Sequence, residues 1–329
     1  MSEAEASGRR GEVGERRPPG PGSGDGAGER QWREPPSAPG EDPPDGAAPG
    51  GREQSGKERE REEEEIHEKA AAPARVVYHA ILKEGEEELS RSNSALWWSG
   101  LAAGLSMGFS LVAEGLLRAY LPEAHWRPLV AKLGYSVGFI IVVLGRQQLF
   151  TENTLTPILP LLKRKELRVF GNVMRLWGVV LVANLVGAAA FAWAVAKTPA
   201  FDPEVKHAFE NIGREAMRHG FGTVLLRGIF AGWLIALMVW LLPVAETARV
   251  WVILIITYLV GLAGSSHVIV GSIESLYLVA GGESTWARYA GQYMVPALVG
   301  NVIGGVSLVA ALNHAQVVAG GDEEGRGGD

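Results

Sequence analysis

The chain has 329 residues, of which 47% are hydrophobic and 21% are charged, and its formal net charge is −6. Because it contains no cysteine, disulfides, thiolate metal sites and cysteine nucleophiles are excluded. Residues 1–73 carry the negative charge, with 18 Asp and Glu against 11 Lys and Arg. The remainder has 19 acidic and 20 basic residues, so it lacks the concentrated basic face of a nucleic-acid-binding protein.

Residues 1–73 differ in composition from the rest of the chain. They are rich in Pro and Gly ("RRPPGPGSGDGAGE", "APGEDPPDGAAPGG") and then densely charged ("GKEREREEEEIHEK"). Such a segment has too little apolar surface to offset the entropy of ordering the chain, so we expect a disordered tail. It also lacks the apolar stretch and cleavage site of a secretory signal. We expect residues 317–329 to be disordered too.

Residues 74–92 form a mixed segment between the tail and the first apolar stretch. Val76, Val77, Ile81 and Leu82 recur near helical spacing, and an acidic run follows. This pattern predicts an amphipathic helix that lies at the membrane surface. An ordinary solvated linker helix is the alternative.

Long apolar segments occupy much of residues 93–316. They lie at 95–117, 129–147, 172–196, 223–243, 250–282 and 293–312. Because a spanning helix needs about 20 apolar residues, we expect an all-α, multi-pass domain with six passages through a lipid bilayer. An even number of passages places both termini on the same side.

Basic residues in the short loops indicate which side that is. The densest cluster is "KRKELR" at 163–168, which the positive-inside rule places in the cytoplasm. Two passages separate this loop from the start of the domain, so we expect both termini to be cytoplasmic. The longer connection at 197–222 also carries four basic residues, Lys197, Lys206, Arg214 and Arg218.

Two apolar segments are interrupted by polar residues. The second is broken at "GRQQLFTENT" (145–154), and the fifth at "SSH" (265–267). Each break lies in the middle segment of its half of the domain, and we expect Gly145, Gly261 and Gly264 to let the backbone turn. Broken helices are tolerated only inside protein or along a cavity, and matched breaks indicate a translocation site between inverted repeats.

Small residues in the third and sixth segments favour close packing of helices. The runs are "LVANLVGAAAFA" and "GNVIGGVS". Gly and Ala let backbones approach, and Asn can donate hydrogen bonds between helices. We therefore interpret Asn184, Asn301 and Gly304 as packing residues.

Four motifs together resemble the formate/nitrite transporter family. They are "LFTENTLT", "RGIFAGWLIALMVW", "GSSHVIVGSI" and "MVPALVGNVIGG", in that order, and the resemblance extends over about residues 75 to 316. It implies an aquaporin-like inverted repeat of six helices with the second and fifth broken, assembled as a homopentamer with one pore in each protomer. It also implies transport of small monovalent anions or their acids, such as formate, nitrite, hydrosulfide, acetate or lactate, and a bacterial inner (cytoplasmic) membrane.

The resemblance also implies roles for individual residues. His267 corresponds to the central pore histidine, Thr151 to the threonine of the broken second helix, and Leu149 and Phe150 to the constriction. His267 would stabilise the anion and donate a proton, since an ordinary histidine pKa near 6.5 suits both tasks. A hydrogen-bonded packing histidine is the alternative. Further candidates for the pore or its vestibules are Gln148, Glu152, Asn153, Ser266 and Arg218.

The sequence departs from the family pattern at several positions. Gln148 stands where the family often has Glu, and Gly232 and Gly271 stand where Asn is common. A family lysine falls on Ala216, with Arg218 near enough to replace its charge. The particular substrate is therefore not inherited from the resemblance.

Two acidic residues inside the predicted spans need separate explanations. Glu114 has Arg118 four residues later, which is typical of a surface ion pair on a helix. Glu274 follows His267 by seven residues, two helical turns along one face. It would tune the histidine or contact a neighbouring protomer.

Two functional classes outside transport, and one other kind of channel, are the alternatives. An enzyme would use Ser265, Ser266 and His267, but adjacent residues rarely place a hydroxyl against an imidazole and no orienting acid is evident. A membrane anchor or sensor with a partner-binding cytoplasmic tail leaves the breaks without a purpose. A neutral-solute channel predicts Asn-Pro-Ala motifs, which are missing from the breaks. We expect a transporter or channel, not an enzyme, without cofactor or metal.

Overall fold

The computed structural model describes residues 74–310 and 312–316, and this part of the chain is helical without strands. Five helical stretches are long and apolar enough to cross a membrane: Asn93–Tyr120, Arg127–Leu144, Leu167–Lys197, Phe221–Val244 and Trp286–Gln316. Two shorter apolar helices, α11 (Arg249–Leu262) and α12 (Val268–Gly281), make up the remaining passage. The predicted all-α membrane fold with a broken second and fifth helix is confirmed, and the predicted tails lie outside the described residues.

Each passage is built from one or more helical elements. The first contains α3 (Asn93–Ser106) and α4 (Gly108–Tyr120), and the second α5 (Arg127–Ala131), η1 (Lys132–Gly134) and α6 (Tyr135–Leu144). The third and fourth are α8 (Leu167–Lys197) and α10 (Phe221–Leu241), the latter followed by η3 (Leu242–Val244). The last contains α13 (Trp286–Arg288), η4 (Tyr289–Met294), α14 (Val295–Val302) and η5 (Ile303–Ala310), of which η4 and η5 are π-helical.

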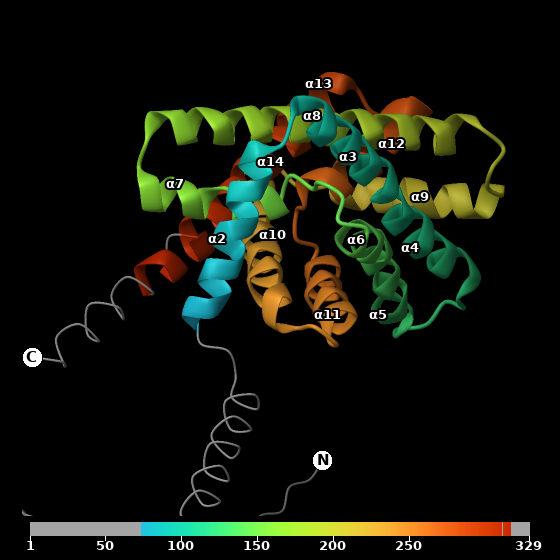
Figure 1. Cartoon of the computed structure of the whole chain (residues 1–329). Helices are drawn as coiled ribbons and strands as arrows, with labels where there is room; N and C mark the ends of the chain where they lie inside the picture. The colour runs from blue at the N-terminus through green and yellow to red at the C-terminus, as the bar shows by residue number, and fades with distance from the viewer. Residues whose placement is uncertain (1–73, 311, 317–329) are drawn as a thin grey trace, which may run out of the picture. The chain divides into compact units, whose positions relative to one another are not determined.

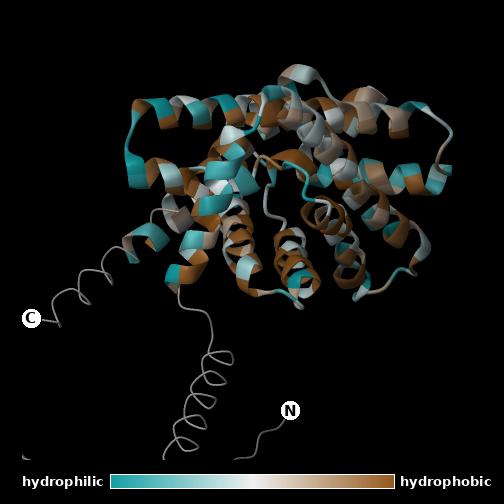
Figure 2. Cartoon of the chain, in the orientation of Figure 1, coloured by the Kyte–Doolittle hydropathy of each residue, from teal (hydrophilic) through white to brown (hydrophobic). Residues whose placement is uncertain are grey.

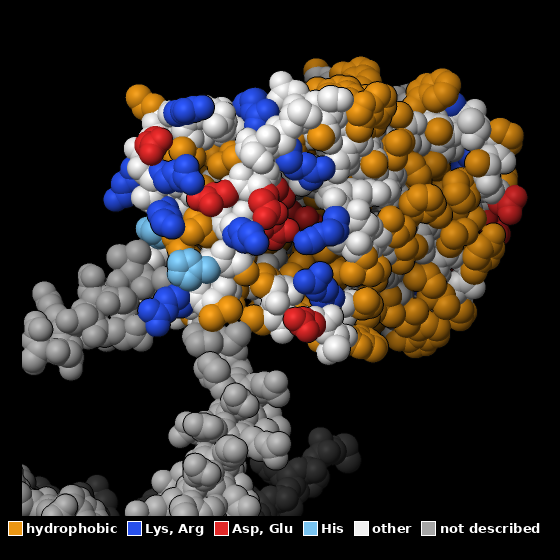
Figure 3. All heavy atoms as spheres, viewed as in Figure 1, with side chains coloured by type: hydrophobic (Ala, Val, Ile, Leu, Met, Phe, Trp, Pro, Cys, Tyr) orange, Lys and Arg blue, Asp and Glu red, His pale blue; other side chains and the backbone are white. Residues whose placement is uncertain are grey.

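Shorter helices lie at the two ends of α8. Figure 1 shows α7 (Ile158–Arg164) joined to its start and α9 (Pro203–Ala216) following its end. Figure 2 shows hydrophilic residues at the α7–α8 turn and apolar residues along α6, α10 and α11. In the same view, Figure 3 shows a broad apolar surface on one side and charged side chains gathered on the other, over α2 and α7. This separation is expected where lipid contacts the sides of a bundle and water contacts its ends.

The segment predicted as an amphipathic helix forms α2 (Ala74–Ser90). Its apolar side packs on α7 and α10 through Val77, Tyr78, Ile81 and Leu82. Gly85 allows the closest approach, because a Cβ there would collide with the carbonyl group of Thr156. The helix therefore docks against the chain that follows the first break.

Within each half of the domain, two helices pack closely at an equivalent glycine. A Cβ on Gly104 of α3 would collide with the backbone of Asn184, and a Cβ on Gly232 of α10 would collide with the backbone of Asn301. In each case the first helix of one half meets the third helix of that half without side chains between them. The inverted repeat is thus visible in the packing, and the backbone of Asn301 takes the space that a side chain at Gly232 would need.

The two breaks turn at equivalent backbone positions. α6 ends at Leu144 and α11 at Leu262, and the second residue after each end has a positive φ, 49° at Arg146 and 60° at Gly264. The expectation for Gly145 was wrong, since its φ is −73° and Arg146 makes the turn. Gly261 does not turn either, because it is helical and packs on the ring of Tyr135.

One asparagine in each half holds the broken backbone. Asn184 accepts a hydrogen bond from the N–H of Phe150 (2.9 Å) and donates to the carbonyls of Gln148 (2.9 Å) and Gly100 (2.7 Å). Asn301 accepts from the N–H of Val268 (2.9 Å) and donates to the carbonyls of Ser266 (2.8 Å) and Gly228 (2.8 Å). These bonds satisfy backbone groups that would otherwise be unpaired in an apolar environment. Leu149 and His267 therefore occupy equivalent positions in the two halves.

Arg146→Gly is expected to raise the free energy of unfolding by about 1 kcal/mol, because a side chain at positive φ is strained. The ion pair it removes, with Glu84 at 3.7 Å, lies at the surface and contributes little. Thermal unfolding in detergent measures the change. Gly264→Ala is the matched control and is expected to lower stability, so a shift of both variants in the same direction would contradict this explanation of the turn.

Candidate functional site

The two breaks bring Thr151 and His267 together. Thr151 Oγ1 lies 2.8 Å from His267 Nε2, and both residues are 0% exposed. His267 caps α12, and its Nδ1 accepts a hydrogen bond from the N–H of Val270 (3.3 Å). These partners assign the proton of the neutral ring to Nε2, which then donates to Thr151. The hydroxyl proton of Thr151 is left to donate to another oxygen.

Apolar side chains surround this pair. Leu149 and Phe150 are buried beside Thr151, and the ring of Phe139 meets the His267 ring edge-on with centroids 4.9 Å apart. Phe150 in turn packs on Trp177, with centroids 5.8 Å apart. The polar pair is therefore enclosed in a dry environment, where each hydrogen bond is stronger than in water.

A hydrogen-bonded network ties the first break to α2. Gln148 Nε2 donates to Glu88 Oε1 (3.1 Å), Thr156 Oγ1 donates to Glu88 Oε2 (2.6 Å), and Asn153 Nδ2 donates to Gln148 Oε1 (2.9 Å). Burial raises the pKa of Glu88, and the hydrogen bonds from Thr156 and Gln148 partly offset this effect. The sequence interpretation missed Glu88, whose carboxyl group binds the side chain of Gln148 from α2.

A vestibule of about 970 Å³ opens beside α2. We call it the α2 vestibule. Gln148 and Glu152 lie in its wall, and one carboxylate oxygen of Glu152 is buried without a hydrogen-bond partner in the described part of the chain. Figure 3 shows acidic and basic side chains side by side on this face. The charged lining is balanced: Lys83, Arg91, Arg146 and Arg249 against Glu84, Glu87, Glu88 and Glu152.

A larger vestibule of about 1560 Å³, the α9 vestibule, lies between α9 and the ends of α4 and α12. Its lining has more basic than acidic residues: Arg118, Arg127, Lys132, Arg214, Arg218 and Arg288 against Glu123, Glu204, Glu215 and Glu283. Net positive charge on a concave surface raises the local concentration of anions.

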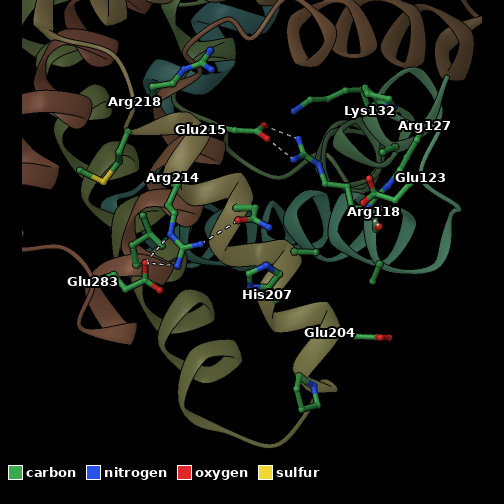
Figure 4. Close-up of a pocket in the computed structure, with 18 of the residues that line it drawn as sticks. Arg118, Glu123, Arg127, Lys132, Glu204, His207, Arg214, Glu215, Arg218 and Glu283 are labelled. Atoms are coloured by element: carbon green, nitrogen blue, oxygen red, sulfur yellow. Dashed lines mark hydrogen bonds and ion pairs between the residues drawn. The ribbon is translucent and has the colours of Figure 1, made fainter. Parts of the chain in front are cut away.

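Ion pairs fix α9 across this vestibule, as Figure 4 shows. Arg118 donates to both carboxylate oxygens of Glu215 (2.7 and 2.8 Å), and Arg214 pairs with Glu283 (2.8 Å). Burial opposes ionisation of Glu215, but the hydrogen bonds from Arg118 outweigh it and lower the pKa of that carboxyl. α9 is therefore held to α4 on one side and to the end of α12 on the other.

The prediction of a surface pair at Glu114 and Arg118 was wrong. Glu114 is 1% exposed, and its Oε1 accepts from both Arg118 (2.7 Å) and Lys132 (2.7 Å). The i,i+4 contact exists, but α5, η1 and α9 cover it. Glu114 is therefore a buried anchor for the two cations that line the α9 vestibule.

The remaining predicted site residues fall around these features. Asn153 belongs to the network with Gln148, and its carbonyl accepts from Trp177 (2.7 Å). Arg218 lies in the α9 vestibule and contacts His219 (3.4 Å). Ser266 lies at the second break, where its N–H donates to the carbonyl of Arg227 (3.3 Å). For packing, a Cβ on Gly304 would collide with the carbonyl of Ile229.

The segments that line the two vestibules lead toward the pair of Thr151 and His267 from opposite ends. The α2 vestibule reaches Gln148, next to Leu149. The α9 vestibule reaches Lys132 and Leu278, which precede Phe139 on the second passage and follow His267 on α12. Neither vestibule is lined by Thr151 or His267.

Comparison with known proteins gives consistent matches. Residues 75–315 match the family model for the formate/nitrite transporter. The inner membrane protein YfdC of Escherichia coli (strain K12) is 42% identical over 244 residues, covering 74% of this chain and 79% of that protein. The formate channel BtFdhC of Bacillus thuringiensis is 26% identical over 240 residues, covering 70% and 89%.

Solved structures share the fold at lower sequence identity. A pentameric formate channel with formate bound aligns with a TM-score of 0.57 and 18% identity over 69% of this chain and 98% of that one. An ion channel of the same family aligns with a TM-score of 0.62 and 18% identity over 71% and 96%.

Proposed function

The chain belongs to the formate/nitrite transporter family, and we propose that it is a channel for small monovalent anions or their conjugate weak acids, such as formate or nitrite. It is a multi-pass membrane protein of a family of channels and transporters, not of enzymes. The observation that carries the proposal is the buried pair of Thr151 and His267, enclosed by apolar side chains between two charged vestibules.

The proposed mechanism follows from the cost of moving charge through a dry constriction. A bare anion is strongly disfavoured there, whereas its conjugate acid is disfavoured far less. His267 would donate a hydrogen bond from Nε2 to the substrate oxygen, or a proton when the ring is in its imidazolium form, and Thr151 would donate a hydrogen bond from its hydroxyl. The N-terminus of α12, which His267 caps, adds a positive potential for an anion at the same place. Leu149 and Phe150 would keep the path narrow.

We also propose the assembly and the orientation. The relatives' names, an inner membrane protein and a pentameric formate channel, support a homopentamer in a bacterial inner membrane. Basic residues at the α7–α8 turn support a cytoplasmic location for that end, and Arg164 there pairs with Glu86 of α2 (2.6 Å). The α2 vestibule and both termini would then face the cytoplasm, and the α9 vestibule would face outward.

Flux into proteoliposomes tests the function. Formate, nitrite, hydrosulfide, acetate and lactate are supplied separately at several pH values, with protein-free liposomes as the control. We expect at least one of these anions to enter faster than in the control, and faster at acidic pH, where more of the weak acid is protonated. If none enters under any condition, the channel function is wrong. Crosslinking in native membrane tests the assembly, and a pattern of monomers alone would contradict a pentamer.

A further inference from the structure

One buried carboxyl group lies on the wall of α12 between the α9 vestibule and His267. Glu274 follows His267 by seven residues and precedes Leu278 by four, so the three side chains share one face of the helix. Leu278 lines the α9 vestibule, and His267 lies against Thr151. Glu274 is 8% exposed. An anion that moves from the vestibule toward His267 along this face would therefore pass the carboxyl group first.

The second passage forms the other wall of this route between the α9 vestibule and His267. Lys132 lines the vestibule, and Tyr135 and Phe139 follow it toward His267. The Lys132 ammonium lies 5.8 Å from the centre of the Tyr135 ring, and the Phe139 ring contacts the His267 ring. Tyr135 also interacts electrostatically with Glu274. Glu274 thus lies near Tyr135, one of the aromatic residues between Lys132 and His267.

The charges near Glu274 are already engaged with one another. Lys132 and Arg118 attract its carboxylate, while Glu114 and Glu215 repel it, and these are the charges that act on it in the described part of the chain. Both cations are bound to Glu114, and Arg118 also binds Glu215. Among the described residues no side chain donates a hydrogen bond to Glu274. Its carboxyl can gain or lose a proton without breaking such a bond.

A tyrosine bridges the interval between Glu274 and His267. The Tyr293 hydroxyl donates a hydrogen bond to the backbone carbonyl of His267 (3.2 Å) and interacts electrostatically with Glu274. Gly271 lies one turn after His267, and a Cβ there would collide with the Tyr293 hydroxyl. The family's Asn at this position is therefore replaced by a phenol from the last passage, which places a second polar group on the route.

We propose that Glu274 protonates the incoming anion on the outer half of the path, before the anion reaches His267. The carboxyl O–H bond breaks and a new O–H bond forms on the anion, so a neutral acid and a carboxylate result. The acid moves on through the constriction, and Glu274 regains a proton from hydronium in the α9 vestibule. This inference rests on the proposed function and assigns the proton donor within it.

Glu274→Gln tests the role, with Glu166→Gln as the control because Glu166 is exposed at the α7–α8 turn and lines neither vestibule. Labelled formate uptake and internal pH are followed together in proteoliposomes at acidic external pH. We expect Glu274→Gln to lower proton-coupled formate uptake about a hundred-fold, the lower end of the range for general acid catalysis, and to flatten its pH profile. Glu166→Gln is expected to behave like the wild type.

The opposite role predicts the opposite change. A carboxylate that is only a fixed negative charge repels anions, so Glu274→Gln would then raise formate uptake at every pH. That result, or unchanged proton influx for each formate, would overturn the inference while the channel function stands. If the Gln variant fails to assemble, Glu274→Asp tests the inference instead. Asp is the stronger acid, so this variant is expected to move the pH profile of formate uptake to lower pH. An unmoved profile would overturn the inference. No uptake by the wild type would overturn the function itself.

Discussion

Asn301→Ala is expected to lower the free energy of unfolding by about 3–5 kcal/mol, because it leaves buried backbone groups without partners. The N–H of Val268 loses its acceptor, and the carbonyls of Ser266 and Gly228 lose their donor. Asn301 is 0% exposed, so the alanine variant leaves these groups buried. Unfolding of detergent-solubilised protein by heat or denaturant measures the loss.

The other half of the domain offers a matched variant. Asn184→Ala removes the equivalent three hydrogen bonds at the first break and is expected to cost a similar amount. Asn211→Ala is the control, since the side chain of Asn211 accepts one hydrogen bond, from Arg214, at the surface of α9. If both interior variants unfold at the same midpoint as this control, the asparagines do not hold the breaks.

His267→Ala is expected to lower formate uptake by about a hundred-fold, because a buried hydrogen-bond donor to the substrate is lost. The change removes the Nε2 donor that faces Thr151. Uptake in proteoliposomes between pH 5 and 8 measures the loss, and with Glu274 as the proton donor the acceleration at acidic pH is expected to remain.

Two further variants separate the histidine's chemistry from its packing. Thr151→Val keeps the shape of the side chain and removes the hydroxyl, so a smaller loss of about ten-fold is expected with the pH dependence retained. His267→Phe fills the space beside Phe139 without a donor and is expected to resemble the alanine variant. If either substitution at position 267 leaves uptake and its pH profile unchanged, His267 is a packing residue.

The architecture was predictable because its signals are local. Runs of apolar residues long enough to span a bilayer are read directly from the chain, and "LFTENT" and "SSH" interrupt two of them at points where the structure also ends a helix. Backbone N–H and C=O groups inside a membrane have few possible hydrogen-bond partners, so polar interruptions of this kind indicate broken helices that are buried in protein or line a cavity.

Contacts between distant segments were not predictable in the same way. Glu88 and Gln148 are 60 residues apart, and only the docking of α2 on the first break brings them within hydrogen-bonding distance. Glu114 was misjudged because an i,i+4 pattern shows the contact with Arg118 but not the elements that bury it. At the first break, the conformational freedom of glycine suggested that Gly145 makes the turn, but the residue with positive φ is Arg146.

The equivalence of Leu149 and His267 has a consequence for how such a pore can diversify. The duplicated scaffold provides two matching positions at its centre, each held by its own asparagine, yet only one carries an ionisable group. Under the proposed function, Leu149 would set the width of the passage and His267 would bind the anion. Substitutions at 149 would then change the size of substrate that passes, and substitutions at 267 would change how strongly an anion is bound. The matching backbone positions would thus let selectivity by size and selectivity by charge evolve independently.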